Sequence, residues 1–331
     1  GVAVGDSPTG PFKDAIGRPL YEGSWDFIDP TVFVDDDGQA YLYWGNPNVY
    51  YAKLNADMVS LDGEVSKVEQ TIESFGSPGP DKREKGKKYK DIYTEGPWLH
   101  KRGGTYYLSY AAGGVPEHIA YSMSDTPTGP WKYMGEIMPL QDTGSFTNHC
   151  GVTDYKGNSY FFYHTGKLPG GGGFGRSVAV EQFSYNPDGT FPIINATTEG
   201  VSPVGTLTPY QRVEAETIAF SEGVKSEWNA KTGVYVSGIH DGDYIKVREV
   251  DFEDLSPKCL CVSVASALRG GWIEIRTDSI GGTLIAEMRV PHTGGWECWT
   301  SIEADVTVPV TGVHDVYFVF KGRKGCELFH F

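Results

Sequence analysis

Two acidic residues and one histidine each stand at the beginning of an apolar stretch that is typical of a strand. Asp29 precedes PTVFV, Glu95 precedes GPWL, and His149 precedes CGVTDY. Two carboxylates facing one sugar can hydrolyse a glycosidic bond, because one of them gives a proton to the leaving oxygen. Burial and a neighbouring negative charge raise the pKa of such a donor. A single acid at a strand start usually caps a turn, so the hypothesis depends on what brings these residues together.

Proline restricts the backbone beside both acids. Pro30 follows Asp29, and Pro97 lies two residues after Glu95. Proline does not continue a helix, and it favours extended backbone in the residue before it. We therefore expect both acids to project from extended segments.

An internal repeat supplies the elements that would position these residues. Each copy holds an apolar strand, a glycine turn and a second strand rich in Tyr and Phe, and the copies span residues 28–45, 93–113 and 148–166. This pattern is typical of a β-hairpin. The turn glycines Gly38, Gly104 and Gly157 recur at intervals of about 50 to 65 residues, which is a usual length for propeller blades.

The repeat predicts propeller blades over residues 24–70, 90–138 and 145–192. Equivalent positions of successive blades meet at one mouth of a central channel, so Asp29 and Glu95 should lie close together there. GDSPTGPF at residues 5–12 repeats SDTPTGPW at residues 124–131. Residues 1–12 are therefore expected to be the tail of a blade, and a closed ring needs at least one more blade upstream.

Composition limits the classes of partner. The net charge is −15 and Lys and Arg form no stripe, which argues against nucleic acid because phosphate binding needs clustered cations. No apolar run approaches the ~20 residues that span a bilayer. A neutral polysaccharide or a calcium ion is compatible with this acidity.

The strand pattern changes after residue 205. Residues 211–331 hold short strands and turns without the blade repeat, which is typical of a β-sandwich. The chain is thus predicted to be all-β, with a propeller part at residues 1–205 and a jelly-roll sandwich at residues 211–331.

The three repeat segments resemble glycoside hydrolase family 43, whose fold is a five-bladed β-propeller. The resemblance implies inverting hydrolysis with three acids. Glu95, in TEGP, matches the general acid, and Asp29, in IDP, matches the carboxylate that raises the pKa of that acid and orients it. His149 resembles a histidine that contacts a calcium ion of the channel through water. Arg176, in GFGRSVAV, matches an arginine that contacts sugar hydroxyls, although Gly175 replaces the usual basic residue before it.

Further residues could line the sugar subsite. Asn46, Trp98 and Tyr43 lie close in sequence to the two acids or to their strands. Aromatic rings stack on sugar faces, and the alternative for Trp98 and Tyr43 is packing in the core of a blade.

The general base of the family is an Asp in a first blade, and no Asp of this chain stands in an equivalent place. Asp35, Asp36 and Asp37 belong to a hairpin turn. Without a base, water is not activated on the far face of the sugar. We therefore expect this chain to lack the general base and to be nearly inactive alone.

VEAETIA, GDYIKV and TGGWECWT resemble a family 6 carbohydrate-binding module over residues 211–331. The resemblance implies a structural calcium site at Glu214 and Glu216, which would share one face of a strand. Trp296 matches an aromatic platform for sugar. Tyr235 is a candidate for sugar contact because Gly238 replaces the second platform aromatic, and His330 is another because it aligns with the Asn that usually hydrogen-bonds sugar.

The pairing of these two resemblances implies an enzyme of plant cell-wall xylan. We expect an α-L-arabinofuranosidase or a β-xylosidase that acts on arabinoxylan, with endo-arabinanase and a non-catalytic, lectin-like propeller as alternatives. The expected protein is a monomer of bacterial type, secreted or periplasmic, with a structural calcium ion and no nucleic-acid or membrane partner.

Overall fold

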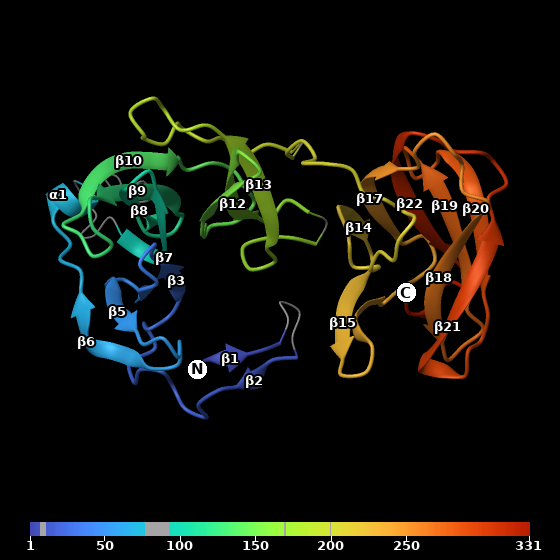
Figure 1. The fold of residues 1–331 in the computed structure, drawn as a ribbon, viewed down its shortest axis with the longest axis horizontal. Helices are drawn as coiled ribbons and strands as arrows, with labels where there is room; N and C mark the ends of the chain where they lie inside the picture. The colour runs from blue at the N-terminus through green and yellow to red at the C-terminus, as the bar shows by residue number, and fades with distance from the viewer. Residues whose placement is uncertain (7–10, 77–92, 169, 199) are drawn as a thin grey trace. The chain divides into compact units, whose positions relative to one another are not determined.

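The computed structural model describes residues 1–6, 11–76, 93–168, 170–198 and 200–331, and it is almost entirely β-structure (Figure 1). Two compact units are present, Gly1–Ala3 with Asp14–Ser202 and Val4–Lys13 with Pro203–Phe331. The predicted all-β class is confirmed. The helix among the described residues, α1 (Ile72–Phe75), is far too short and too polar to cross a bilayer.

Three antiparallel sheets build the first unit, and in each sheet strands that are neighbours in sequence pair with one another. The first sheet contains β3 (Thr31–Val34), β4 (Ala40–Trp44), β5 (Tyr50–Leu54) and β6 (Leu61–Lys67). The second contains β7 (Tyr93–Arg102), β8 (Thr105–Ala112), β9 (His118–Ser124) and β10 (Lys132–Met138). The third contains β11 (Gly151–Tyr155), β12 (Asn158–Thr165) and β13 (Ser177–Phe183).

The sheets correspond to the three predicted blades, and their first strands β3, β7 and β11 contact one another in turn. None of the sheets described closes on itself, so the number of blades in a complete ring stays a prediction. β1 (Ala3–Val4) and β2 (Lys13–Asp14) form a separate two-stranded sheet. The described part of the expected blade tail, residues 1–6 and 11–12, therefore adds to none of the three sheets, and residues 7–10 lie outside the described residues.

Glycine turns close the first hairpin of each sheet, as the repeat predicts. Gly38, Gly104 and Gly157 have φ values of 86°, 87° and 82°. Residues with a side chain adopt this region with difficulty, whereas glycine does so at little cost. The same turn chemistry therefore sets the register of all three hairpins.

Aromatic side chains fill the space between neighbouring sheets. Tyr43 and Tyr110 are fully buried in the cluster between the first and second sheets, and Phe161 is fully buried in the cluster between the second and third. The Tyr43 hydroxyl donates to the Pro127 carbonyl at 2.7 Å. The prediction that Tyr43 lines a sugar subsite is therefore wrong, because its ring belongs to the core.

A charged contact joins the turn of the first sheet to the second. Lys101 Nζ lies 2.7 Å from Asp35 Oδ1 and 2.9 Å from Asp36 Oδ2. The Tyr106 hydroxyl donates to Asp35 Oδ2 at 2.6 Å. Asp35 and Asp36 are turn residues, as predicted, and their carboxylates also fix the distance between two blades.

The second unit is a sandwich around one apolar core. Its largest sheet orders β14 (Phe220–Glu222), β17 (Tyr244–Asp251), β22 (Val313–Lys321), β19 (Gly271–Thr277) and β20 (Thr283–Val290). Two pairs complete it, β15 (Lys225–Asn229) with β16 (Gly233–Ser237) and β18 (Cys259–Ser266) with β21 (Gly295–Asp305). Ile273, Ile275 and Phe320 lie at the centre of the core.

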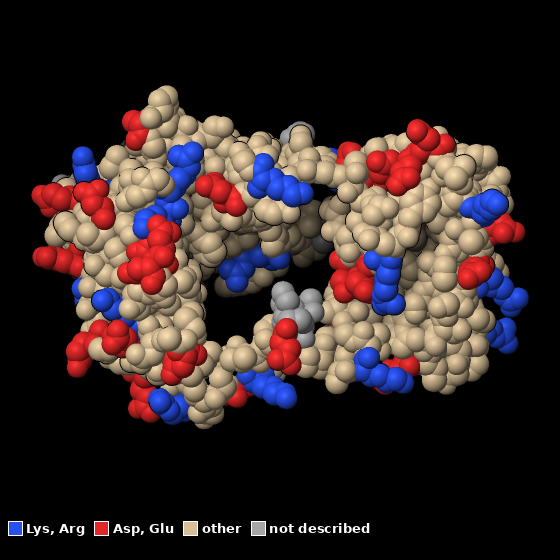
Figure 2. Space-filling model, viewed as in Figure 1, with Lys and Arg blue, Asp and Glu red and all other residues tan. Residues whose placement is uncertain are grey.

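Charged side chains are mixed over the surface. On the face of the described residues that Figure 2 shows, Lys and Arg are scattered among Asp and Glu and form no continuous stripe.

His100 is a packed histidine that should make stability depend on pH. Its ring stacks on Tyr107 with centroids 4.9 Å apart, and Nε2 lies 3.0 Å from the Tyr185 hydroxyl. Burial lowers the pKa of His100 from 6.5 to about 4. The unfolded chain therefore binds this proton first, and the contribution to stability is complete above pH 6.5 and is lost as the pH falls toward 4.

We expect the free energy of unfolding of the first unit to fall by up to about 3 kcal/mol between these pH values through this group. His100→Phe keeps the ring contact and cannot titrate. Urea unfolding of both proteins across the pH range measures the difference, in which the contributions of other groups cancel. If the free energies of unfolding of the wild type and His100→Phe depended on pH in the same way, the lowered pKa of His100 would be contradicted.

Candidate active site

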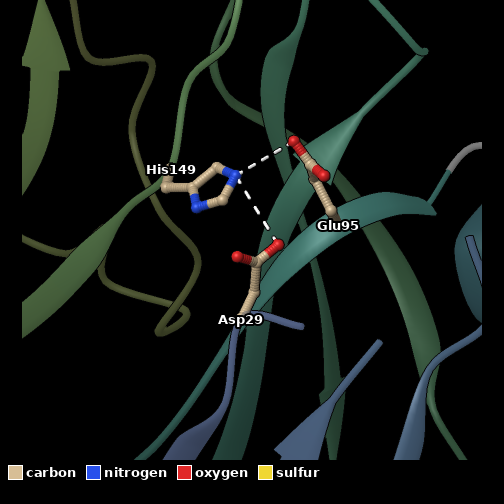
Figure 3. A group of neighbouring side chains, drawn as sticks. All are labelled: Asp29, Glu95 and His149. Carbon is tan, nitrogen blue, oxygen red and sulfur yellow. Dashed lines mark hydrogen bonds and ion pairs between the residues drawn. The ribbon is translucent and has the colours of Figure 1, made fainter. Parts of the chain in front are cut away.

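Asp29, Glu95 and His149 meet at one end of the three sheets, as the repeat predicts (Figure 3). Asp29 lies just before β3, Glu95 near the start of β7, and His149 just before β11. His149 Nε2 is 3.2 Å from Glu95 Oε1 and 4.0 Å from Asp29 Oδ2. The imidazole thus stands between the two carboxylates.

The backbone at this junction departs from the expectation for a residue before proline. Asp29 has a φ of 56°, in the left-handed region rather than in extended backbone. Few residues other than glycine adopt this region, and Asp is among the more tolerant. The backbone of Gly96 acts to lower the pKa of Asp29, so the second sheet lies close to the carboxylate that adopts this unusual conformation.

Gly96 brings the second sheet close to His149. Its φ is 60°, and a Cβ added to it would lie 2.9 Å from the ring carbon Cγ of His149. Glycine is therefore required at this position both by the backbone and by the approach of the imidazole.

Glu95 is held by several donors. Its Oε1 contacts His149, and its Oε2 accepts a hydrogen bond from the Asn46 amide. The hydrogen bond with His149 is the main reason that the pKa of Glu95 is lowered, against the effect of burial. This direction is opposite to the raised pKa expected for the general acid, because the hydrogen bonds with His149 and Asn46 outweigh burial.

The other two members of the cluster have raised pKa values. Burial raises the pKa of Asp29, and the negative charge of Glu95 adds to this, while the charge of His149 opposes it. Burial disfavours the charged form of His149, but the hydrogen bond with Glu95 and the charge of Asp29 outweigh it and raise the pKa of His149.

Arg176 lies beside this cluster. It is exposed, its Nη1 donates to Thr147 Oγ1 at 3.3 Å, and its charge lowers the pKa of Asp29. His164, at the end of β12, contacts the Thr147 carbonyl at 2.6 Å and its ring centroid lies 5.8 Å from that of His149. Sequence reasoning missed His164, although this residue stands in the third repeat segment.

Glu117 is a second residue that the sequence reasoning missed. It is buried directly before β9 and lies within hydrogen-bonding reach of Glu95. The predicted subsite residue Asn46 contacts Glu95 directly. Trp98 is half-buried, packs against the cluster between the second and third sheets and donates its indole N–H to the Val152 carbonyl at 3.2 Å, and its contact with sugar stays a prediction.

An aromatic group marks the candidate sugar site of the second unit. Trp296 stacks on His330 with centroids 5.0 Å apart, and His330 Nδ1 lies 2.9 Å from the Trp296 carbonyl. Tyr235 and His330 are only 8% and 7% exposed. This corrects their predicted direct contact with sugar, because their rings are packed away from solvent, and it makes them supports for Trp296.

The predicted calcium ligands of the second unit do not share a strand. Residues 213–218 form a turn before β14, with the Thr217 N–H donating to the Glu214 carbonyl at 3.0 Å. Both carboxylate oxygens of Glu214 accept from Arg212 at 2.8 Å. This pairing does not fit a calcium site that needs free oxygen ligands from Glu214.

At His149, the ring nitrogen that faces the acids is engaged by Glu95. Calcium prefers oxygen ligands, so the imidazole itself is a poor ligand for it. Calcium binding at His149 stays a prediction, and no step below runs through a metal.

Propeller-type sheets that present two carboxylates at one end are the arrangement of a β-propeller glycosidase. The family model described as "Glycosyl hydrolases family 43" matches residues 1–191, and "Carbohydrate binding module (family 6)" matches residues 214–331. The chain belongs to glycoside hydrolase family 43 and carries a family 6 carbohydrate-binding module.

The similarity to known proteins extends over both units. The arabinoxylan arabinofuranohydrolase of Bacillus subtilis (strain 168) is 35% identical over all of this chain and 69% of its own length. The arabinoxylan arabinofuranohydrolase of Paenibacillus polymyxa is 33% identical over 99% of this chain and 55% of its own length. A crystal structure of a family 43 arabinoxylan arabinofuranohydrolase from Bacillus subtilis in complex with cellotetraose superposes with a TM-score of 0.82, 34% identity and coverage of 100% and 72% of the two chains.

Removing the carboxylate of Glu95 should lower the pKa of His149. Glu95→Gln deletes the charge that supports the imidazolium, so burial then acts with less opposition. The pH titration of the His149 ring signals by NMR measures this change, with His149→Gln to assign them. The matched control is Glu64→Gln, an exposed glutamate of β6. An unchanged His149 pKa in Glu95→Gln would contradict the coupling.

Proposed function

We propose that this chain is the core of an inverting glycoside hydrolase that removes α-L-arabinofuranosyl groups from arabinoxylan-type polysaccharide. The observation that carries this proposal is the cluster of Asp29 and Glu95 around His149, in a chain of family 43. The similarity to arabinoxylan arabinofuranohydrolases over the whole chain supports the substrate. A polymer of the plant cell wall suits an enzyme that is secreted or periplasmic.

The geometry supports distinct roles for the two acids. An inverting pair of acid and base stands about 6.5 to 9.5 Å apart, so that a water molecule fits between base and sugar. Oxygens of Asp29 and Glu95, with Nε2 of His149, lie within 4.8 Å of one another. Asp29 is thus too close to Glu95 to be the base, and it suits a carboxylate that orients Glu95 and modulates its charge.

Glu95 is the proposed proton donor to the leaving oxygen. As the bond between the anomeric carbon and that oxygen breaks, the proton of Glu95 passes to the oxygen, while water attacks from the opposite face. Arg176 would hold sugar hydroxyls beside the acids. Among the described residues, the other carboxyl that reaches Glu95 is Glu117, which is 4% exposed and so has no room for a water and a sugar.

An external nucleophile should therefore replace the missing base. Azide needs no proton removed before it attacks, so it should raise turnover of an aryl α-L-arabinofuranoside by about 10²-fold or more, the usual contribution of a general base. The product should be the β-configured arabinofuranosyl azide, identified by NMR. Turnover of an aryl β-xyloside under the same conditions tests the alternative substrate class.

Two results would contradict parts of this proposal. Equal turnover with and without azide would show that a base is present, and an α-configured product would exclude inversion. Glu95→Gln should lose turnover of substrates with poor leaving groups far more than of an activated aryl glycoside, because only the former need the acid. Glu64→Gln is the matched control and should behave as the wild type.

Binding to xylan through the second unit is a further part of the proposed function, supported by the match to a carbohydrate-binding module. Trp296→Ala should reduce retention on insoluble xylan, since it removes the ring that His330 supports. Trp228→Ala, a 43% exposed tryptophan of β15, is the matched control. Retention of Trp296→Ala equal to that of the wild type would exclude the Trp296 surface as the binding site.

A further inference from the structure

Glu117 is a buried carboxyl group beside the candidate acid, and the hydrolysis described above gives it no role. It is 4% exposed, and its backbone N–H donates to the Phe146 carbonyl at 3.0 Å. Its side chain lies within hydrogen-bonding reach of the Glu95 carboxylate. Burial of a charge without compensation costs folding free energy, so the protonation state of Glu117 needs a physical explanation.

The two oxygens of Glu117 have different surroundings. Oε2 accepts a hydrogen bond from the backbone N–H of Asn148 at 2.8 Å. Oε1 is buried, and no donor among the described residues reaches it. The carboxylate of Glu95 also lies beside Glu117, and it can only accept when it is ionised. Two ionised carboxylates repel at such a contact, so one of the two groups must carry a proton.

The distribution of donors decides which group that is. Glu95 already accepts hydrogen bonds from Asn46 and contacts His149, and both favour its ionised form. Glu117 has one backbone donor and is the more deeply buried of the two. Burial raises the pKa of Glu117 to about 8, which agrees with this distribution.

We propose that Glu117 is a protonated carboxylic acid that positions Glu95. Its O–H donates to the Glu95 carboxylate, while Oε2 holds the backbone of Asn148, the residue before His149. These contacts close a ring from Glu95 through Glu117 and Asn148 to His149 and back to Glu95. Glu117 acts through Glu95 and does not touch the sugar. The proposal rests on the proposed function in that Glu95 is the general acid.

The contact between Glu117 and Glu95, and with it this closed series of contacts, should be lost when Glu117 loses its proton. Above about pH 8 the O–H no longer donates, and two facing carboxylates repel. The charged groups that face Glu117 are Glu95 on β7 and His149 before β11. His118, the next residue and the first of β9, is paired with Glu136 of β10 at 3.6 Å.

Two variants distinguish a role of Glu117 as a neutral hydrogen-bond donor from a role in packing alone. Glu117→Gln is uncharged at every pH, and its amide can donate to Glu95 and accept from Asn148. Glu117→Ala removes both contacts. At neutral pH, the infrared band of a protonated carboxyl should be present in the wild type and absent from both variants, and it should disappear from the wild type above pH 8. Identical spectra of the wild type and Glu117→Gln would overturn the proposal.

The NMR signal of the Asn148 backbone amide reports the state of Glu117, because this N–H donates to Glu117 Oε2. In the wild type it should shift as the pH passes about 8, because its acceptor Oε2 becomes part of a carboxylate. In Glu117→Gln this transition should be missing, although the titration of His149 is still present. A transition of the same size in Glu117→Gln would assign it to His149 and would overturn the proposal.

Turnover with azide provides the functional readout. Glu117→Gln should stay near the wild-type rate at neutral pH and should keep it above pH 8, where the wild type declines. Glu117→Ala should lose about 10²-fold, as expected when a reacting group is misplaced. Equal losses in both variants would contradict a neutral positioning role. Absence of azide-dependent turnover in the wild type would count against the proposed function, whereas the infrared band and the Asn148 amide still decide the state of Glu117.

Discussion

The contact between Glu95 and His149 is the constraint on which the rest of the site depends. It joins β7 to the segment before β11, 54 residues apart in sequence. Two partly buried carboxylates this close repel strongly when little water screens them. The imidazole between Asp29 and Glu95 provides the compensating charge, and both acids in turn raise the pKa of His149. Each of the three groups therefore shifts the pKa of at least one of the others.

The fold makes this meeting possible because the three groups occupy equivalent places in a radial repeat. Buried rings such as Tyr110 and Phe161 set the distance between neighbouring sheets, and Lys101 binds the turn of the first sheet through Asp35. Gly96 then allows the second sheet to approach His149 more closely than any side chain would permit. The precision of the site thus comes from contacts between sheets and not from the local chain.

Repeated features were the predictable part of the structure. Three hairpins and the convergence of Asp29 and Glu95 follow from a pattern that occurs in each blade. Glu117 could not be found in this way, because it stands before the third strand of its sheet, where no repeat position carries an acid. The φ of Asp29 is set by its tertiary surroundings, which override the local effect of Pro30. Tyr43 was assigned to the cleft because aromatic residues on strands serve both cores and sugar sites.

The charge state of the cluster depends on burial together with the donors that each carboxyl group meets, and this reconciles the lowered pKa of Glu95 with its proposed role as acid. Glu117, the most buried carboxyl group, keeps the proton, whereas the more accessible Glu95 and Asp29 share the charge of His149. A sugar that covers the site expels water and so disfavours the ionised form of Glu95. The hydrogen bond with His149 supplies a route for a proton to Glu95 at that moment. Glu95 is therefore poised to gain its proton when substrate arrives, instead of holding it in the uncovered site.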